Sequence, residues 1–363
     1  MELQNFIDNN DNYIDIFKNN GLRVKTFSKY NLILVKYSYN MEIDMNSYQK
    51  YCRGCIIDTN NKTVVFVPPC KADNINIDGS NIPNENFIIQ DLYDGTMINL
   101  FYHNDKWIIS SRSDIDCNNK WNNQKSFKTL FQECGNINLD LLNKNHTYSF
   151  VMQHVENRNV SHVNENCLIL VEEYDRNGFI LLNNIIDENF VYNGFQKSVN
   201  FKIYDINQLN EYMTMAINNT YFSWKGYTIK CNNTRINYIN PLFTYVKNLK
   251  INSSNMLFSF CELLLKNDGS INNYIQYFPE HNALFMEYFN KYNKFIDEVY
   301  KMYVDFRITK QITLDDIPFH IKPLTRDLHG IYLSSQIKIN KNKVTEYIKN
   351  LPSAKLTFHL KNY

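Results

Sequence analysis

The sequence predicts an α+β protein whose first two thirds form antiparallel sheet and whose last third is helical. From about Asn31 to Ile229, short runs of β-branched and aromatic residues are separated by Asn, Asp and Gly, a pattern typical of antiparallel strands. After about Leu242 the apolar residues recur at intervals of three and four, the spacing of one helix face. We therefore expect a first domain at residues 1–242 and an all-helical second domain at residues 243–363.

The strands expected in the first domain follow the apolar runs in chain order. The turn-forming pairs Asn104-Asp105 and Asn177-Gly178 lie where antiparallel hairpins need them. The runs that predict strands are residues 32–37, 55–58, 63–67, 97–102, 106–110, 148–154, 168–171 and 227–230.

A long amphipathic helix is predicted at residues 285–306, behind Pro279 at a first helical turn. Its aromatic stripe is interpreted as core, because such faces are usually buried. Residues 256–266 and 344–350 are predicted to form further helices. The segment 321–363 carries eight basic side chains against two acidic ones, so the second domain ends in a basic tail. This tail could meet phosphate, and a solvated helix face explains it equally well.

Composition excludes several classes of protein. The net charge is only +1, so the whole molecule does not attract nucleic acid by its global field. No apolar run is long enough to span a membrane, and the N-terminal residues resemble no secretory signal, so we expect a cytoplasmic protein without a membrane partner. Among eight cysteines only Cys52 and Cys55 form a CxxC pair, and they are interpreted as reduced core residues rather than as metal ligands.

The segment Gln-Asp-Leu-Tyr-Asp-Gly-Thr at residues 90–96 is the most informative in the chain. It resembles the Lys-x-Asp-Gly-Ser/Thr signature of enzymes that bond a nucleotide covalently to the lysine. Leu92 stands where that lysine belongs, and a hydrocarbon has no lone pair with which to attack an α-phosphate. Asp94 and Gly95 are interpreted as keeping a hairpin turn of the ancestral protein.

Several further segments, taken in order, resemble the motifs of the bacteriophage-type RNA ligase 1 family of the covalent nucleotidyltransferase superfamily. The resemblance implies an antiparallel-sheet nucleotidyltransferase (ATP-grasp-like ligase) domain, and the heavy use of Asn, Lys, Ile, Tyr and Phe favours a viral gene. Chance matches should not be collinear over roughly two hundred residues, so the order of the segments carries the resemblance. The segments are residues 51–58, 67–74, 92–96, 107–113, 148–160, 224–229 and 235–237.

The resemblance also implies that the catalytic residues have been lost. Beside Leu92 at the nucleophile position, Val151 and Lys225 stand where the family has two carboxylates, and Asn237 replaces the second lysine of the last motif. Carboxylates of this kind hold the metal and orient the ribose, so both functions are compromised. No residue of the chain is therefore assigned a catalytic or metal-binding role.

Binding chemistry is implied to persist. By resemblance, nucleotide or phosphate contacts are expected from Arg53, Lys71, Asp94, Gly95, Arg112, Lys230 and Arg235. The residues expected to contact RNA are Arg158, Trp107 and Lys225.

These observations favour an RNA ligase-like protein that has lost nucleotidyl transfer and binds RNA, nucleotide phosphate or a protein complex. One alternative is a divergent active RNA ligase or guanylyltransferase that uses Lys71 or Lys225 and requires ATP or GTP with Mg²⁺. Another is an architectural subunit of a viral replication or transcription complex, located in a viral factory or virion. No cofactor is assigned on the first reading, and the partners that remain open are RNA and viral or host proteins.

Overall fold

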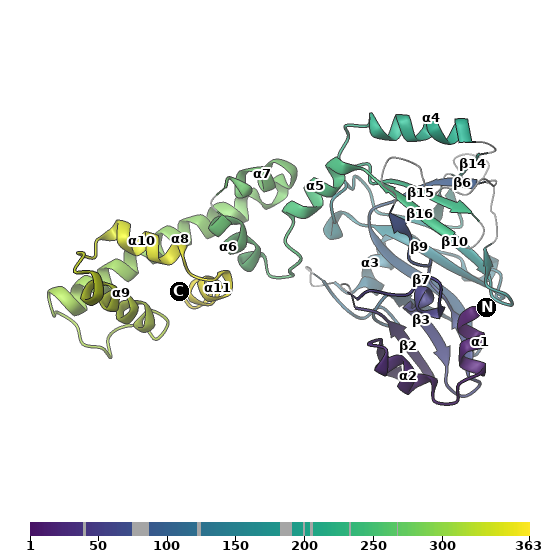
Figure 1. Cartoon of the computed structure of the whole chain (residues 1–363), viewed down its shortest axis with the longest axis horizontal. Coiled ribbons are helices and arrows are strands. Elements are labelled where there is room, and N and C mark those ends of the chain that lie inside the picture. Colours follow the sequence, from purple (N-terminus) through teal and green to yellow (C-terminus); the bar gives the residue numbers. More distant parts are fainter. Residues whose placement is uncertain are drawn as a thin grey trace. The chain divides into compact units, whose positions relative to one another are not determined.

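The computed structural model describes residues 1–38, 41–74, 87–121, 125–181, 191–198, 200–203, 206–231, 234–266 and 268–363. The chain forms two compact units, Met1–Tyr245 and Val246–Tyr363. The first contains antiparallel sheets and the second contains helices, so the predicted α+β fold class with a helical C-terminal region is confirmed (Figure 1). None of the described helices combines the length and the hydropathy that a membrane span requires.

A four-stranded antiparallel sheet begins the first unit. One face of this sheet packs on two short helices and a 3₁₀ turn, and the free cysteines Cys52 and Cys55 are buried in that core. In sheet order the strands are β1 (Arg23–Phe27), β2 (Leu32–Lys36), β3 (Arg53–Asp58) and β4 (Thr63–Phe66), and the helical elements are α1 (Glu2–Asp8), α2 (Tyr13–Asn19) and η1 (Tyr48–Tyr51).

A seven-stranded sheet forms the middle of the unit. Asn104 and Asp105 both have positive φ, 47° and 60°, which is the geometry of a two-residue hairpin turn and confirms the expected turn at this pair. Its strands run in the order β12 (Val191–Tyr192), β13 (Phe195–Lys197), β10 (Cys167–Asp175), β9 (His146–Gln153), β7 (Thr96–His103) and β8 (Lys106–Ser111), with β11 (Ile180–Leu181) beside β10. The helix α3 (Phe127–Cys134) packs on one face, and the 3₁₀ turns η2 (Leu139–Leu141) and η3 (Val155–Asn157) flank β9.

A five-stranded sheet completes the unit, and the helix α4 (Ile206–Ile217) covers one of its faces. Leu209 and Met213 of this helix pack against Ile89 and Ile229 of the sheet. The strand order is β14 (Asn200–Ile203), β6 (Phe87–Asp91), β15 (Gly226–Cys231), β16 (Thr234–Ile239) and β5 (Asp73–Asn74).

The second unit confirms the predicted long helix. This helix begins at Asn282, directly after the turn at Pro279. Most of its predicted apolar face is buried, whereas Phe289 is 41% exposed. The helical elements are α5 (Pro241–Leu249), which spans the boundary of the units, α6 (Met256–Lys266), α7 (Ser270–Tyr277), η4 (Pro279–His281), α8 (Asn282–Tyr303), η5 (Val304–Ile308), α9 (Lys322–Ser335), α10 (Lys341–Lys349) and α11 (Ser353–Asn362).

Two histidines are buried in the core of this helical unit. The rings of His320 and His359 lie 6.5 and 6.1 Å from the ring of Phe295, centroid to centroid. Burial lowers the pKa of both imidazoles, and the charge of Lys355 acts in the same direction on His359. The folded unit therefore favours their neutral forms.

We predict that the helical unit loses stability in mild acid. Unfolded histidine has a pKa of about 6.5, so below that pH the unfolded chain binds protons that the folded unit excludes, and the free energy of unfolding falls. Thermal melts by circular dichroism at about pH 7.5 and about pH 5.5 test this expectation. All three tryptophans, Trp107, Trp121 and Trp224, belong to the first unit, so their fluorescence reports that unit separately.

The matched variants are His320→Phe with His359→Phe, which should reduce the pH dependence, and His162→Gln at an exposed position, which should preserve it. An unchanged helical melting temperature across this pH range in the natural protein would contradict the prediction.

Candidate functional site

The segment with the missing lysine connects β6 to β7. These strands belong to the five-stranded and the seven-stranded sheet, so residues 92–95 cross between two sheets and do not form the expected hairpin turn. Leu92 N donates to the carbonyl oxygen of Gly226 at 2.8 Å, which ties the start of the crossing to β15. The expectation of a hairpin was wrong because the strands before and after the segment pair with different partners.

Asp94 and Gly95 shape this crossing. The Asp94 carboxylate accepts the backbone N–H groups of Val160 and Ser161 at 2.8 and 3.0 Å and so fixes the loop that follows β9. Gly95 has a φ of +155°, and a Cβ there would lie 2.5 Å from the carbonyl oxygen of Met152. Backbone geometry alone accounts for an Asp-Gly pair at this place.

Val151 lies in an apolar cluster that also contains Ile169 and Val171. Tyr93, Met97 and Cys167 pack against the same group. Mg²⁺ in proteins is held by oxygen ligands, and this cluster supplies hydrocarbon where the sequence resemblance implies a carboxylate. No group of three or more His, Cys, Asp or Glu side chains suited to a metal ion occurs in the described residues. The residues at this position therefore do not fit a magnesium site.

Lys225 brings an ammonium group close to the crossing segment. Its Nζ donates to the carbonyl oxygen of Tyr93 at 3.1 Å and lies 5.9 Å from the centroid of the Phe243 ring. Lys225 directly precedes β15, and Tyr93 directly follows Leu92. The Lys225 ammonium group therefore contacts the backbone next to the position where the lysine of the signature is missing. This contact holds the crossing segment against the five-stranded sheet.

Asn237 is engaged within the sheet. Thr228 Oγ1 donates to Asn237 Oδ1 at 2.8 Å, and the two residues are opposite each other on β15 and β16. The Asn237 amide oxygen is thus satisfied by its strand neighbour.

A β-bulge in β10 joins the seven-stranded sheet to the five-stranded one. The pairing with β9 shifts between Leu170 and Glu172, so Val171 is the extra residue. The carbonyl oxygen of Val171 accepts hydrogen bonds from Gln90 Nε2 at 3.0 Å and from Lys230 Nζ at 3.2 Å. Both donors belong to the five-stranded sheet, so the bulge supplies a point of attachment between the sheets.

Glu172 is the centre of a buried ion cluster, which we define as Glu172, Lys230, Arg235 and Tyr174. Lys230 Nζ lies 3.3 Å from Glu172 Oε1, Arg235 forms a second ion pair with the same oxygen, and the Tyr174 hydroxyl donates to Oε2 at 2.5 Å. Glu172 and Lys230 are 3% and 7% exposed. Sequence reasoning missed Glu172 entirely.

Burial changes the acid–base behaviour of the two cations. It lowers the pKa of Lys230 to about 7 and that of Arg235 to about 10, because the charged forms lose their hydration. The charge of Cys70 opposes this shift for both cations. The charge of Arg53 lowers the pKa of Arg235 further, so Arg53 lies close to the ion cluster.

Lys71 and Arg112 lie at the same region of the first unit. Lys71 follows Cys70, which is close enough to Lys230 and Arg235 to interact with their charges. Arg112 Nη2 donates to the carbonyl oxygen of Tyr37 at 3.1 Å, and its guanidinium lies 5.0 Å from the centroid of that ring. The backbone of Arg112 also approaches Gly54, where a Cβ would lie 3.0 Å from the Arg112 carbonyl oxygen.

Two residues that were expected to contact RNA are engaged in other contacts. Trp107 packs edge-on against Tyr102 and beside Tyr148, on the face of the sheet that α3 covers, opposite to the face that carries Val151. Arg158 donates from Nη2 to the carbonyl oxygen of Val160 at 2.9 Å, so it braces its own loop. The structure does not bring Trp107 together with the other residues predicted for the site.

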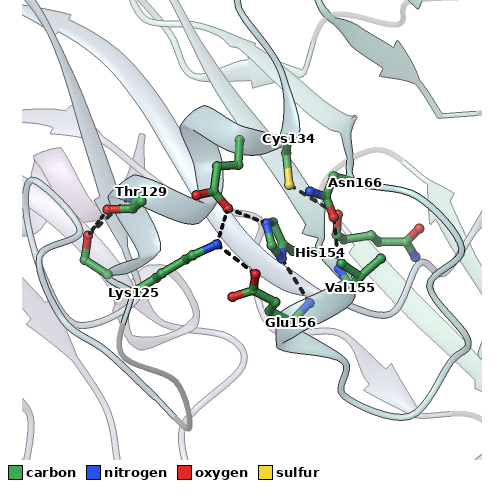
Figure 2. A network of polar contacts seen from close by, with 10 residues as sticks. Lys125, Thr129, Cys134, His154, Val155, Glu156 and Asn166 are labelled. Carbon is green, nitrogen blue, oxygen red and sulfur yellow. Dashed lines mark hydrogen bonds and ion pairs between the residues drawn. The ribbon is translucent and has the colours of Figure 1, made fainter. Parts of the chain in front are cut away.

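His154 has a carboxylate partner that the local sequence does not reveal. Its Nε2 lies 2.9 Å from Glu133 Oε2, and its Nδ1 accepts the backbone N–H of Glu156 at 3.1 Å (Figure 2). Lys125 bridges the carboxylates of Glu133 and Glu156 at 2.9 and 2.8 Å. With both ring nitrogens engaged and the ring 1% exposed, His154 serves as a structural joint between α3 and η3.

No family model matches this chain, and no curated protein matches it either. Solved structures that are similar to it include two forms of an archaeal ATP-dependent RNA ligase. Form 1 has a TM-score of 0.47 and 11% identity over 72% of this chain and 68% of its own, and form 2 has 0.47 and 10% over 93% and 78%. A protein from Aquifex aeolicus assigned as an ATP-dependent DNA ligase has a TM-score of 0.45 and 13% identity over 80% of each chain.

We predict that Glu172→Gln strongly destabilises the first unit. Removing one partner from a buried charge pair leaves uncompensated charge and typically costs about 3–5 kcal/mol. Chemical denaturation followed by tryptophan fluorescence measures the free energy of unfolding. The control is Glu165→Gln, a nearby exposed carboxylate. A Glu172→Gln variant as stable as this control would show that the ion cluster does not hold the sheets together.

Proposed function

We propose that this protein binds RNA through the phosphate backbone and does not transfer a nucleotidyl group. The observation that carries the proposal is the replacement of catalytic groups by structural ones, while cations remain nearby. Val151 lies in an apolar cluster, and Lys225 donates to a backbone carbonyl. Arg53 is retained beside the ion cluster and Arg112 beside the Tyr37 ring.

Loss of the nucleophile is sufficient to abolish the covalent step. Leu92 cannot attack a phosphate, and removal of a nucleophile typically lowers a rate by about a millionfold. A metal ion could stabilise charge in such a reaction, but the apolar cluster around Val151 offers it no oxygen ligand. Asp94 and Gly95 persist because they shape the crossing segment and the loop beyond it.

The remaining cations fall into two groups, according to whether they form an ion pair. Lys230 and Arg235 are committed to Glu172 inside the protein, so we assign them a supporting role. In the part of the chain that the structure describes, Arg53 and Lys71 form no ion pair, and both are partly exposed. We therefore assign direct phosphate contacts to Arg53 and Lys71, with Arg112 beside them on the Tyr37 ring.

A second candidate function is a divergent nucleotidyltransferase that uses Lys225 as its nucleophile. One observation favours it: Lys225 Nζ lies 3.1 Å from the carbonyl oxygen of the residue that follows Leu92. The same hydrogen bond engages the amine with a backbone carbonyl rather than with a phosphate. We therefore place this candidate second, and an assay for a covalent adduct decides between the two.

We predict that no covalent adduct forms when the protein is incubated with labelled ATP or GTP and a divalent metal ion and then denatured. The variant Leu92→Lys should also remain unlabelled, because restoring the amine does not restore oxygen ligands at Val151. Labelling of the natural protein that disappears in Lys225→Ala would overturn the proposal in favour of the second candidate.

We further predict that RNA affinity depends on salt through Arg53 and Lys71. Each phosphate contact to a single strand contributes a slope of about −0.7 in log K against log salt, so Arg53→Gln with Lys71→Gln should flatten the slope by about 1.4. Fluorescence anisotropy with a labelled single-stranded RNA measures this slope. The control replaces Lys18 and Lys266, two exposed cations, with Gln.

Absence of measurable RNA affinity at low salt would contradict this function and favour the architectural alternative. Equal flattening by the control pair would show that net charge, rather than these positions, governs binding.

A further inference from the structure

The four-stranded sheet carries three cations in register, which none of the ligase-like motifs accounts for as a group. Arg23 on β1 is opposite Lys36 on β2, and Lys36 is opposite Arg53 on β3. Directly opposite residues project from the same face of a sheet, so the three side chains form one line across the strands. We call Arg23, Lys36 and Arg53 the cationic row.

A β-bulge creates this alignment. The pairing of β2 with β3 shifts between Val35 and Lys36, which leaves Gly54 as the extra residue of β3 and places Arg53 opposite Lys36. Gly54 has a φ of +116°, a conformation that side chains rarely adopt. The same glycine admits the backbone of Arg112, whose charge acts on Lys36.

The cationic row opposes folding. Like charges directly opposite each other on neighbouring strands are destabilising. Burial lowers the pKa of Lys36, and the charges of Arg112, Arg23 and Lys25 lower it further. Repulsion from Arg23 of the row and from the neighbouring cations Arg112 and Lys25 therefore acts on the protonation of Lys36.

Carboxylates do not compensate the row. Within the described residues, no ion pair includes Arg23, Lys36 or Arg53. Asp114, which pairs with the neighbouring Lys25 at 2.5 Å, also accepts the backbone N–H of Asn118 at 3.1 Å. Lys36 donates instead to the neutral hydroxyl of Ser113 at 2.6 Å. The positive charge of the cationic row is therefore available to an external anion.

We infer that the cationic row binds the phosphodiester backbone of a single-stranded nucleic acid and leads it from Arg53 across the sheet to Arg23. The inference rests on the proposed RNA-binding function, whose phosphate contacts begin at Arg53. The row spans two strand spacings, about 9.5 Å, which exceeds the axial rise of about 3.4 Å per phosphate of a stacked strand. More than one phosphate is therefore contacted, and the strand crosses β3, β2 and β1 in that order.

The test uses the double variant Arg23→Gln with Lys36→Gln in the full chain. We expect the slope of log K against log salt for labelled oligouridylate to flatten by about 1.4, because two phosphate contacts of about 0.7 each are lost. The same loss is expected with oligodeoxythymidylate, whose backbone carries the same phosphates. The melting temperature should stay the same or rise, because repulsion within the row is relieved.

The control variant is Lys18→Gln with Lys62→Gln, which removes the same charge from cations that have carboxylate partners. The inference about the cationic row would be overturned, and the proposed function kept, by one outcome. In it, Arg23→Gln with Lys36→Gln has the salt slope of the natural protein, while Arg53→Gln with Lys71→Gln flattens the slope. A lowered melting temperature of the row variant would also overturn the inference, because the row would then stabilise the fold. Absence of nucleic-acid binding by the natural protein would instead refute the proposed function.

Discussion

The bulge at Val171 is the constraint on which the first unit depends. One extra residue in β10 turns the Val171 carbonyl toward the five-stranded sheet, where Gln90 and Lys230 donate to it. The same bulge reverses the alternation of side chains, so Glu172 faces inward beside Ser149 instead of continuing the apolar face of Leu170. A carboxylate at that depth requires cations, and Lys230 and Arg235 supply them.

The contrast between two groups of cations explains how, on the proposed function, a site without catalytic groups binds phosphate. Lys230 and Arg235 share the Glu172 carboxylate, which neutralises part of their charge inside the protein. Arg53 and Lys36 have no such partner in the described chain, and their charge is available to an anion. Catalysis by a ligase needs an amine, oxygen ligands and cations together, whereas phosphate binding needs the cations alone. On the proposed function, the substitution at Val151 removes the reaction without removing the affinity for phosphate.

Local pattern was sufficient to predict the hairpin at Asn104-Asp105, the long helix at Asn282–Tyr303 and strands β2, β3, β4, β7, β8, β9, β10 and β15. Strands β1, β6 and β16 were not predicted. The crossing at Leu92 was not predictable, because it depends on which sheet each flanking strand joins. Glu172 was missed because a bulge breaks the period of two by which a buried position is recognised. The partner of His154 is Glu133, which is distant in sequence, so no local motif contains the pair.

The cationic row was hidden from sequence reasoning for a related reason. Arg23 and Lys36 each end or begin an ordinary strand, and nothing in either segment is unusual for a surface cation. Only the register of three strands, set by the bulge at Gly54, makes them neighbours. A buried charge must be paired for the fold to survive, whereas a half-exposed row of like charges can persist at a modest cost. Unpaired cations of the second kind therefore indicate a surface for anions more reliably than the motif residues do, because the fold gains nothing from keeping them adjacent.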